Sequence, residues 1–293
     1  MSRFKGLFPR TLHAKFRSRY SLQFDERFYD ITSFQNFLDK NSFLSDSDFI
    51  ARAARRIVKR GATEPLTGTS IGKGLLSLAN GLREGMTYDG LNARMRAIWL
   101  AMARLPSSSQ RHDTAIYAAE AITPMAMRLR GMFPKFLGSE YVEDADRAHS
   151  LYPIPIQDLQ ALDLRDDAFD IVITNEVLEH VPSIDRALSE IFRILKPGGV
   201  HIGTLPFLYD REQSIVRAKL ENGSVVHIMP PEYHENPVDP KGGALVFEIP
   251  GWNLLQRARA TGFSDVHIRF ILSTRHGCIS EGIGGLLILS MTK

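Results

Sequence analysis

The amino-acid sequence predicts an α/β fold: a doubly wound, mostly parallel sheet with an antiparallel hairpin at one edge, preceded by a helical N-terminal region. Three observations support this prediction. Apolar strand-like runs alternate with helical segments from about residue 112 to residue 205, short turns connect them, and two strand-like runs near the end have no helix between them. Such alternation predicts right-handed crossovers and a sheet covered on both faces. A ligand is then expected at the carboxyl ends of the strands.

The N-terminal region, residues 1–105, is expected to be helical because residues 20–105 lack clear two-residue alternation. Helices are predicted over 47–58, capped by Ser45 or Ser47, and over 91–105. The arm 1–20 carries basic and aromatic residues, and Arg3 to Arg19 contains no acid. This arm could contact an anionic membrane surface or a phosphate-bearing substrate, or it is an ordinary terminal segment. Residues 106–110 are predicted to be a linker to a second domain, 106–293.

The elements of the second domain follow from composition and from start and stop signals. Thr123 is expected to cap a helix whose first residue is Pro124, and Ser183 to cap a second helix that ends at Lys196-Pro-Gly-Gly199. A final pair of strands without an intervening helix should be antiparallel. The predicted strands are 114–119, 136–140, 169–174, 200–205, 266–272 and 285–291, and the predicted helices are 124–133, 182–195 and 252–260.

Two adjoining motifs carry a family resemblance. The run from Ala168 to Val181, AFDIVITNEVLEHV, is followed by Glu190 to Gly199, EIFRILKPGG. This pattern resembles the class I S-adenosylmethionine (SAM)-dependent methyltransferases, in which FDxVxxxxVLEH precedes ExxRxLKPGG. The resemblance implies a Rossmann-like fold, SAM as cofactor and methyl transfer as the reaction.

The resemblance also implies positions for the cofactor. Glu140, at the end of the second strand, would bind the ribose hydroxyls, because a carboxylate accepts two hydrogen bonds. Asp158 with Leu159 would bind the adenine, Asn175 and Glu176 would face the sulfonium and methionine part, and His180 lies in the segment that follows. Structural roles remain open for three of them: Glu140 as a solvated strand end, Asp158 as a turn residue and His180 as a locally packed side chain.

The first loop departs from the family pattern. It has the acid, Glu120, but lacks the glycines that normally let the cofactor approach, and Ala121, Ile122 and Thr123 should narrow the approach. The helix that begins at Pro124 still offers free N–H groups to the methionine carboxylate. The sequence resembles a divergent branch of the family in which Glu-x-x-Thr-Pro and Gly-Ser-Glu-Tyr replace the usual loop, so Glu120 and Thr123 are expected to bind the cofactor.

An insertion at about 207–250 also resembles that branch and is expected to hold the acceptor. Methyl transfer is an in-line displacement that needs a base only if the acceptor is a hydroxyl. His234, Tyr233 and His227 are candidate base or positioning residues, and Arg211 and Arg217 could hold an anionic part of the acceptor. The Pro-Pro-Glu-Tyr-His turn could equally be a rigid loop with a satisfied histidine.

Composition excludes several other classes of protein. The 293 residues contain one cysteine, Cys278, and no zinc-ligand spacing, so we expect no disulfide and no metal. No apolar run approaches the roughly 20 residues of a membrane span, and no secretory signal is visible, so a cytoplasmic protein is expected. A net charge of +3 is too small to indicate a nucleic-acid-binding protein.

The sequence therefore predicts a SAM-dependent methyltransferase that modifies a small-molecule or glycan-like acceptor, through an oxygen atom. A catalytically inactive binding or scaffold protein is the first alternative, because the first loop lacks glycines. A nucleic-acid methyltransferase guided by the basic arm is the second. The N-terminal helices would cap the site or form a homodimer contact.

Overall fold

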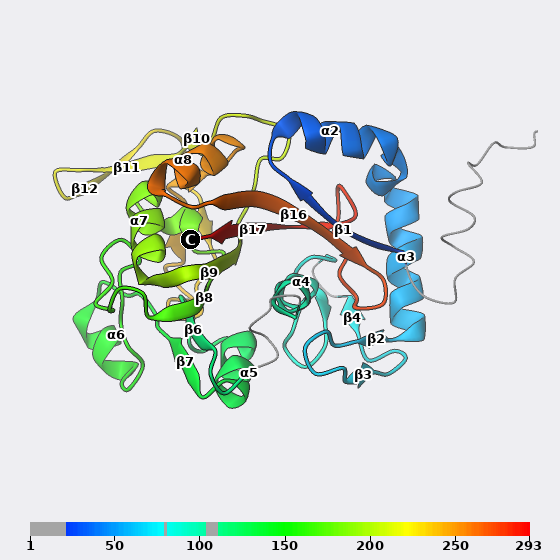
Figure 1. Ribbon diagram of the computed structural model, residues 1–293, viewed down its shortest axis with the longest axis horizontal. Helices are drawn as coiled ribbons and strands as arrows, with labels where there is room; N and C mark the ends of the chain where they lie inside the picture. The colour runs from blue at the N-terminus through cyan, green and yellow to red at the C-terminus, as the bar shows by residue number, and fades with distance from the viewer. Residues whose placement is uncertain (1–21, 79–80, 104–110) are drawn as a thin grey trace, which may run out of the picture.

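The computed structural model describes residues 22–78, 81–103 and 111–293. A seven-stranded sheet forms its centre (Figure 1). In their order across the sheet, the strands are β7 (Lys135–Gly138), β6 (Ala115–Ala118), β8 (Phe169–Asn175), β9 (Leu195–Thr204), β17 (Leu286–Thr292), β16 (Asp265–Ser273) and β1 (Gln23–Phe28). The expected arm 1–20 and the linker 106–110 lie outside the described residues.

The parallel half of the sheet confirms the prediction. β6 is parallel to β7 and to β8, and β8 is parallel to β9. The middle of β8 is buried on both faces, which explains its continuous branched apolar run. β16 and β17 form the predicted antiparallel hairpin, and β17 is also antiparallel to β9. The fold is thus Rossmann-like and mostly parallel, as the sequence predicts.

The outermost strand on the hairpin side was not predicted. β1 pairs with β16 along its whole length, so the hairpin is not the edge and the helical prediction for residues 20–105 is wrong here. Only Phe24 and Phe28 of β1 are buried, and the three residues between them are polar. Asp25 of that polar stretch binds the guanidinium of Arg269 in two places, at 2.6 and 2.9 Å. Apolar alternation therefore could not reveal the strand.

Helices cover the sheet on both faces, with α2 and α8 above it and α4 and α5 below it in Figure 1. Thr123 and Ser183 cap α5 and α7 as predicted, whereas Asp46 rather than a serine caps α3. The helices are α2 (Ile31–Lys40), α3 (Ser47–Arg60), α4 (Ala93–Met102), α5 (Pro124–Met132), α6 (Ala145–Ser150), α7 (Ile184–Ile194) and α8 (Asn253–Thr261). Among the described residues, none of the helices is both long and apolar enough to span a bilayer.

An aromatic cluster ties the N-terminal region to the sheet. Phe34 of α2 packs edge-on against Phe28 of β1, with ring centroids 5.0 Å apart, and lies 5.7 Å from the ring of Trp252 beside α8. Phe270 of β16 lies 6.2 Å from Phe34 and completes the contact. Burying aromatic side chains of this size contributes strongly to stability. The first helix is thus fixed to the strands that close the chain.

Short antiparallel ribbons complete the structure. The N-terminal region contains β2 (Ala62–Thr63) with β3 (Ser70–Ile71), and β4 (Ser77–Leu78) with β5 (Met86–Thr87). The insertion contains β10 (Ile215–Val216) with β15 (Glu248–Ile249), β11 (Ala218–Glu221) with β12 (Ser224–His227), and β13 (Tyr233–His234) with β14 (Ala244–Leu245). Between α6 and Asp158, the described residues form a single bridge, between Glu140 and Ile156, and no full strand.

Candidate functional site

Glu120 joins the first loop to the end of β8. Its carboxylate accepts a hydrogen bond from the Thr123 hydroxyl and another from the Asn175 amide, each at 2.5 Å. Burial raises the pKa of Glu120, although these hydrogen bonds and the charge of Arg94 oppose the shift. The carboxyl ends of β6 and β8 are therefore held together by a polar contact made of three predicted site residues.

The first loop adopts its shape without glycines. No residue from 119 to 124 has a positive φ, so nothing in the loop backbone requires glycine. The Ala121 side chain is fully buried. Glycine is needed instead at the end of β7, which faces the loop, because a Cβ on Gly138 would lie 2.5 Å from the carbonyl oxygen of Glu120. The close backbone approach thus occurs between the loop and the end of β7.

Glu140 holds the same loop from the end of β7. Its Oε1 accepts hydrogen bonds from the backbone N–H groups of Ala121 and Ile122, at 2.7 and 3.1 Å. Burial raises the pKa of Glu140, and the two backbone hydrogen bonds oppose that shift. In the described part of the chain, its Oε2 accepts no hydrogen bond from the protein. One oxygen of this carboxylate is structural and the other is available.

Asp158 closes a turn next to this edge. Its Oδ1 accepts from the backbone N–H of Gln160 at 2.9 Å, and the neighbouring Leu159 is buried. The turn role that the sequence left open is therefore present. Its adenine-binding role remains a prediction.

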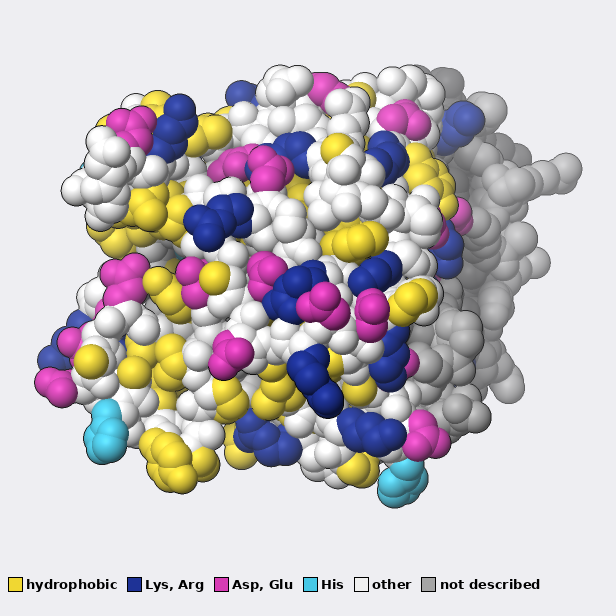
Figure 2. All heavy atoms as spheres, turned by 60° about the vertical axis from the view of Figure 1, so that its left-hand side comes forward, with side chains coloured by type: hydrophobic (Ala, Val, Ile, Leu, Met, Phe, Trp, Pro, Cys, Tyr) yellow, Lys and Arg dark blue, Asp and Glu magenta, His cyan; other side chains and the backbone are white. Residues whose placement is uncertain are grey.

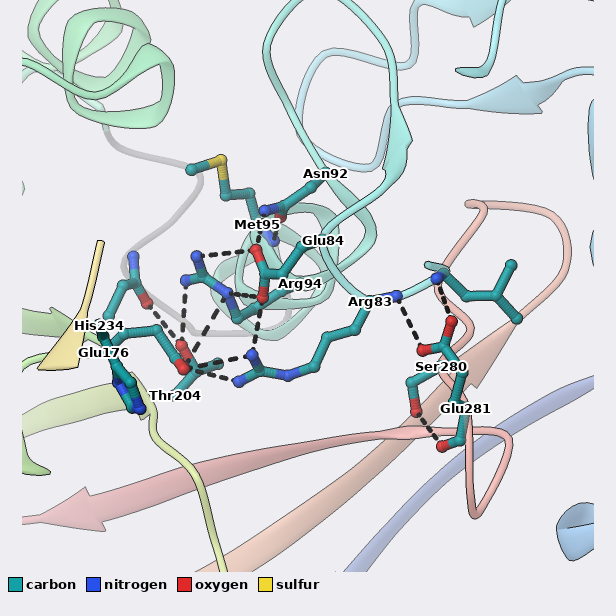
Figure 3. A network of polar contacts seen from close by, with 12 residues as sticks. Arg83, Glu84, Asn92, Arg94, Met95, Glu176, Thr204, His234, Ser280 and Glu281 are labelled. Carbon is teal, nitrogen blue, oxygen red and sulfur yellow. Dashed lines mark hydrogen bonds and ion pairs between the residues drawn. The ribbon is translucent and has the colours of Figure 1, made fainter. Parts of the chain in front are cut away.

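Glu176 is held by two arginines from the N-terminal region (Figure 3). Arg83 binds its carboxylate in two places, at 2.6 and 3.2 Å, and Arg94 lies 3.9 Å away. Arg94 also donates to the Thr204 hydroxyl at 3.2 Å and to Glu84 at 2.8 Å. Burial alone would raise the pKa of Glu176, but Arg83 and Arg94 hold it below its usual value.

We call these side chains the arginine cluster: Arg83, Glu84, Asn92, Arg94 and Glu176. Of these five residues, only Glu176 was predicted from the sequence as a site residue. One signal was present, because α4 is otherwise apolar and yet contains two arginines, Arg94 and Arg96, both buried. Buried arginines require partners, so charges within an apolar helix indicate an internal polar network.

A second cluster follows in the short helix η3 (Leu178–His180). The Glu179 side chain is 0% exposed, and neither carboxylate oxygen has a hydrogen-bond partner within the described residues. His180 Nε2 lies 3.5 Å and His234 Nδ1 lies 3.8 Å from Glu179 Oε1. The two imidazole rings are perpendicular, with centroids 5.0 Å apart. We call Glu179, His180 and His234 the Glu/His cluster.

The far sides of both imidazoles are also engaged. His180 Nδ1 lies 2.8 Å from the carbonyl oxygen of Leu245, and His234 Nε2 lies 3.3 Å from Glu232 Oε1. Glu179 raises the pKa of His234, and Glu232 adds to the shift while burial opposes it. His180 and His234 were predicted from the sequence as separate site residues, whereas Glu179 and its contact with both histidines were not predicted.

The other predicted acceptor residues lie apart from this cluster. Tyr233 is exposed on β13, and His227 is exposed at the end of β12. Arg211 is exposed, whereas Arg217 is half-buried and binds Glu232 at 3.1 Å and the Pro230 carbonyl at 2.9 Å. Arg217 therefore supports the insertion in this structure. Substrate contacts for all four remain predictions.

Comparison with known proteins finds a family match over part of the chain. Residues 135–203, from β7 to the end of β9, match the family described as Methyltransferase domain. Over this segment the chain is similar to the methyltransferase domain family. The match includes both motifs on which the resemblance was based. It also includes Glu140, Asp158, Asn175 and Glu176.

Curated relatives share this domain in part. Demethylmenaquinone methyltransferase of Streptomyces avermitilis is 41% identical over 87 residues, 30% of this chain and 38% of that protein. Arsenite methyltransferase of Aquipseudomonas alcaligenes is 46% identical over 44 residues, 15% of this chain and 13% of that protein. The human protein named Arginine-hydroxylase NDUFAF5, mitochondrial, is 33% identical over 105 residues, 33% of this chain and 30% of that protein. The chain thus spans less than two fifths of each relative's length.

Solved structures of methyltransferases show a distant likeness. A SAM-dependent methyltransferase from Mesorhizobium loti is 17% identical with a TM-score of 0.42, over 67% of this chain and 98% of that chain. The Burkholderia thailandensis 1,6-didemethyltoxoflavin-N1-methyltransferase, solved with S-adenosylhomocysteine, is also 17% identical. Its TM-score is 0.39, over 67% of this chain and 78% of that chain.

Proposed function

We propose that this protein transfers the methyl group of SAM to an oxygen atom of a small-molecule or glycan-like acceptor. The observation that carries the proposal is the arrangement at the carboxyl ends of β6, β7 and β8. Glu120, Glu140 and Asn175 follow these adjacent strands, within or beside the matched methyltransferase domain. Ligands of doubly wound sheets bind at this edge.

The cofactor would bind polar groups beside the first loop that make no hydrogen bond within the described protein. Glu140 Oε2 accepts no hydrogen bond from the described residues, so it could accept one from a ribose hydroxyl while Oε1 keeps the loop in place. The N-terminus of α5 follows directly and favours a carboxylate such as that of the methionine part. A glycine-poor loop is compatible with these contacts because no residue from 119 to 124 has a positive φ and the Ala121 side chain is buried.

The acceptor would lie between this edge and the insertion. Of the three candidate bases, His227, Tyr233 and His234, it is His234 that lies next to the segment after β8. Its Nδ1 is 3.8 Å from Glu179 Oε1. We therefore place the acceptor oxygen beside the Glu/His cluster. Holding two reactants in line lowers the barrier of a displacement reaction by a large factor.

A titration of SAM and S-adenosylhomocysteine by calorimetry tests the cofactor half of the proposal, with EDTA present. Binding should weaken about tenfold or more in Glu140→Ala, since a charge-assisted hydrogen bond contributes about 1.5–3 kcal/mol. Asp158→Ala should weaken it as well, and the exposed Glu221→Gln should leave it unchanged. Absence of binding at millimolar ligand would overturn the proposal in favour of a scaffold role.

The nucleic-acid alternative has less support on the face seen in Figure 2. Lys and Arg side chains there lie among acidic ones and do not form one continuous basic surface. A nucleic-acid methyltransferase would show RNA or DNA binding that weakens steeply with salt. The same purified protein can be tested for that dependence.

A further inference from the structure

We propose that Glu179, His180 and His234 bind a divalent transition-metal ion, with Zn²⁺ as the simplest occupant. One carboxylate oxygen and two imidazole nitrogens lie within 4.8 Å of one another. Two histidines and one glutamate form a common donor set for Zn²⁺, and a similar set binds Fe²⁺. The three residues come from η3 and β13, so the insertion completes a site that the segment after β8 begins.

The surroundings of the Glu179 carboxylate favour a cation at this place. Glu179 is 0% exposed, and both of its oxygens lack hydrogen-bond partners in the part of the chain that the structure describes. A buried carboxylate is very costly unless it is paired, hydrogen-bonded or bound to a metal. The groups that face Glu179 Oε1 are the two imidazole nitrogens at 3.5 and 3.8 Å, beyond ordinary hydrogen-bond length.

The outer hydrogen bonds fix which imidazole nitrogens face inward. The carbonyl oxygen of Leu245 can only accept, so His180 Nδ1 carries a proton and donates it. Glu232 likewise accepts from His234 Nε2. In the neutral imidazoles, Nε2 of His180 and Nδ1 of His234 then present lone pairs towards an oxygen that also has only lone pairs. Such an arrangement needs a proton or a metal ion between the groups.

The distances suit a metal better than a proton. Ligand bonds of about 2.0–2.1 Å in a tetrahedral zinc site place neighbouring donor atoms about 3.3–3.4 Å apart. The observed separations of 3.5 and 3.8 Å lie close to this value. Metal-bound histidines also donate their second N–H to a carbonyl or carboxylate, as both histidines do here.

Three protein ligands leave a coordination position open, which is typical of catalytic rather than structural zinc sites. Water or an acceptor oxygen could occupy it, and a bound hydroxyl would lose its proton more readily. This consequence rests on the proposed methyl transfer. Metal binding itself does not, because the site can be titrated without SAM or acceptor.

The test is a titration of the full chain, stripped with a chelator, with Zn²⁺ by calorimetry and with Co²⁺ by visible absorption. We expect one ion per chain and the intense bands of four-coordinate Co²⁺. Glu179→Gln and His234→Ala should each weaken binding by about a hundredfold or more. Loss of a residue that only hydrogen-bonds to a metal ligand typically weakens binding by about 10–100-fold. His149→Ala, which removes an exposed histidine on α6, should bind as the native chain does.

Several results would overturn the metal site. Co²⁺ bands that survive both Glu179→Gln and His234→Ala would place the ion elsewhere, and the absence of binding at millimolar Co²⁺ would leave protonated imidazoles as the partners of Glu179. Thermal unfolding of each variant shows whether it is folded, and His234→Ala keeps the test decisive because His234 is only half-buried. SAM titration in EDTA fails or succeeds independently.

Discussion

Two glutamates three residues apart, Glu176 and Glu179, have the same side chain but very different surroundings. Glu176 lies in the arginine cluster, where Arg83 binds it at 2.6 Å. Glu179 lies in the Glu/His cluster and is more deeply buried, with 0% of its side chain exposed against 24% for Glu176. The better buried acid thus has the weaker protein partners.

The difference shows how a complete polar network can be distinguished from an incomplete one. A guanidinium is always charged and donates five N–H groups, so Arg83 and Arg94 neutralise Glu176 by themselves. An imidazole is mostly neutral near pH 7 and must be protonated before it can form an ion pair with an acid. The arginine cluster therefore stabilises the fold, whereas the Glu/His cluster is arranged to receive a cation.

The largest expected effect comes from breaking the complete network with Arg94→Met. The Arg94 side chain is 10% exposed, and its loss leaves the largely buried Glu176 with Arg83 as its remaining cationic partner and removes the hydrogen bond to the exposed Glu84. Removing one partner of a buried pair costs about 3–5 kcal/mol of unfolding free energy. Urea unfolding measures this loss, and Arg27→Met, which removes an exposed pair, should change stability by less than about 1 kcal/mol. A loss below about 1 kcal/mol for Arg94→Met would show that charge does not hold the cluster.

A matched pair of isosteric variants compares the two acids directly. Glu176→Gln should lower the unfolding free energy by about 1.5–3 kcal/mol, because charge-assisted hydrogen bonds to Arg83 are lost. In EDTA, Glu179→Gln should change it by less than about 1 kcal/mol, because a neutral amide is less costly to bury and can donate to an imidazole lone pair. Equal losses from both substitutions in urea unfolding would mean that the imidazoles already neutralise Glu179.

The sequence predicted the part of the fold that depends on local pattern. The branched run of β8 and the caps Thr123 and Ser183 give local signals, and the structure confirms each. The helix before Lys196-Pro-Gly-Gly199 does end, at Ile194, but these four residues belong to β9. β1 gave no such signal, because its inward side is limited to Phe24 and Phe28 and its polar residues pair with a distant strand. Tertiary contacts decide that strand.

The sequence predicted the site residues that stand at the ends of strands, but it did not predict the contacts between residues far apart in the chain. Glu120, Glu140 and Asn175 follow strands that a pattern can locate, and the structure brings them to one loop. The contacts of Glu176 with Arg83, and of Glu179 with His234, join residues that are far apart in sequence. Only the packing of the N-terminal region and the insertion against the sheet creates those pairs.

Acid should destabilise the protein through a buried imidazole that faces no carboxylate. His201 lies on β9 between Val172 and Met291, its Nε2 contacts the Thr174 hydroxyl, and burial lowers its pKa to about 3. Below about pH 6.5 the unfolded chain binds a proton that the folded chain does not, so stability falls as pH falls towards 3. This histidine alone should remove about 2 kcal/mol between pH 7 and pH 5.

Urea unfolding at several pH values measures that slope, and His201→Gln should reduce it, whereas the exposed His149→Ala should not. An unchanged slope in His201→Gln would mean that His201 becomes protonated in the folded chain. His201 is thus fully buried and faces no acid among the described residues, whereas the half-buried His234 lies 3.8 Å from Glu179 and 3.3 Å from Glu232.

The smallest expected effect concerns the outer partner of the Glu/His cluster. Glu232 Oε1 lies 3.3 Å from His234 Nε2, and Arg217 holds its other oxygen at 3.1 Å. Glu232→Gln keeps the shape and removes the charge that orients the imidazole, so Zn²⁺ should bind about tenfold more weakly, a difference of about 1.4 kcal/mol. Calorimetric titration of the variant measures this change.

The unfolding free energy in EDTA should change by less than about 1 kcal/mol, since the Arg217 pair is partly exposed. If Zn²⁺ affinity is unchanged while stability falls, Glu232 serves only to hold Arg217, and the outer hydrogen bond does not orient His234 towards Glu179.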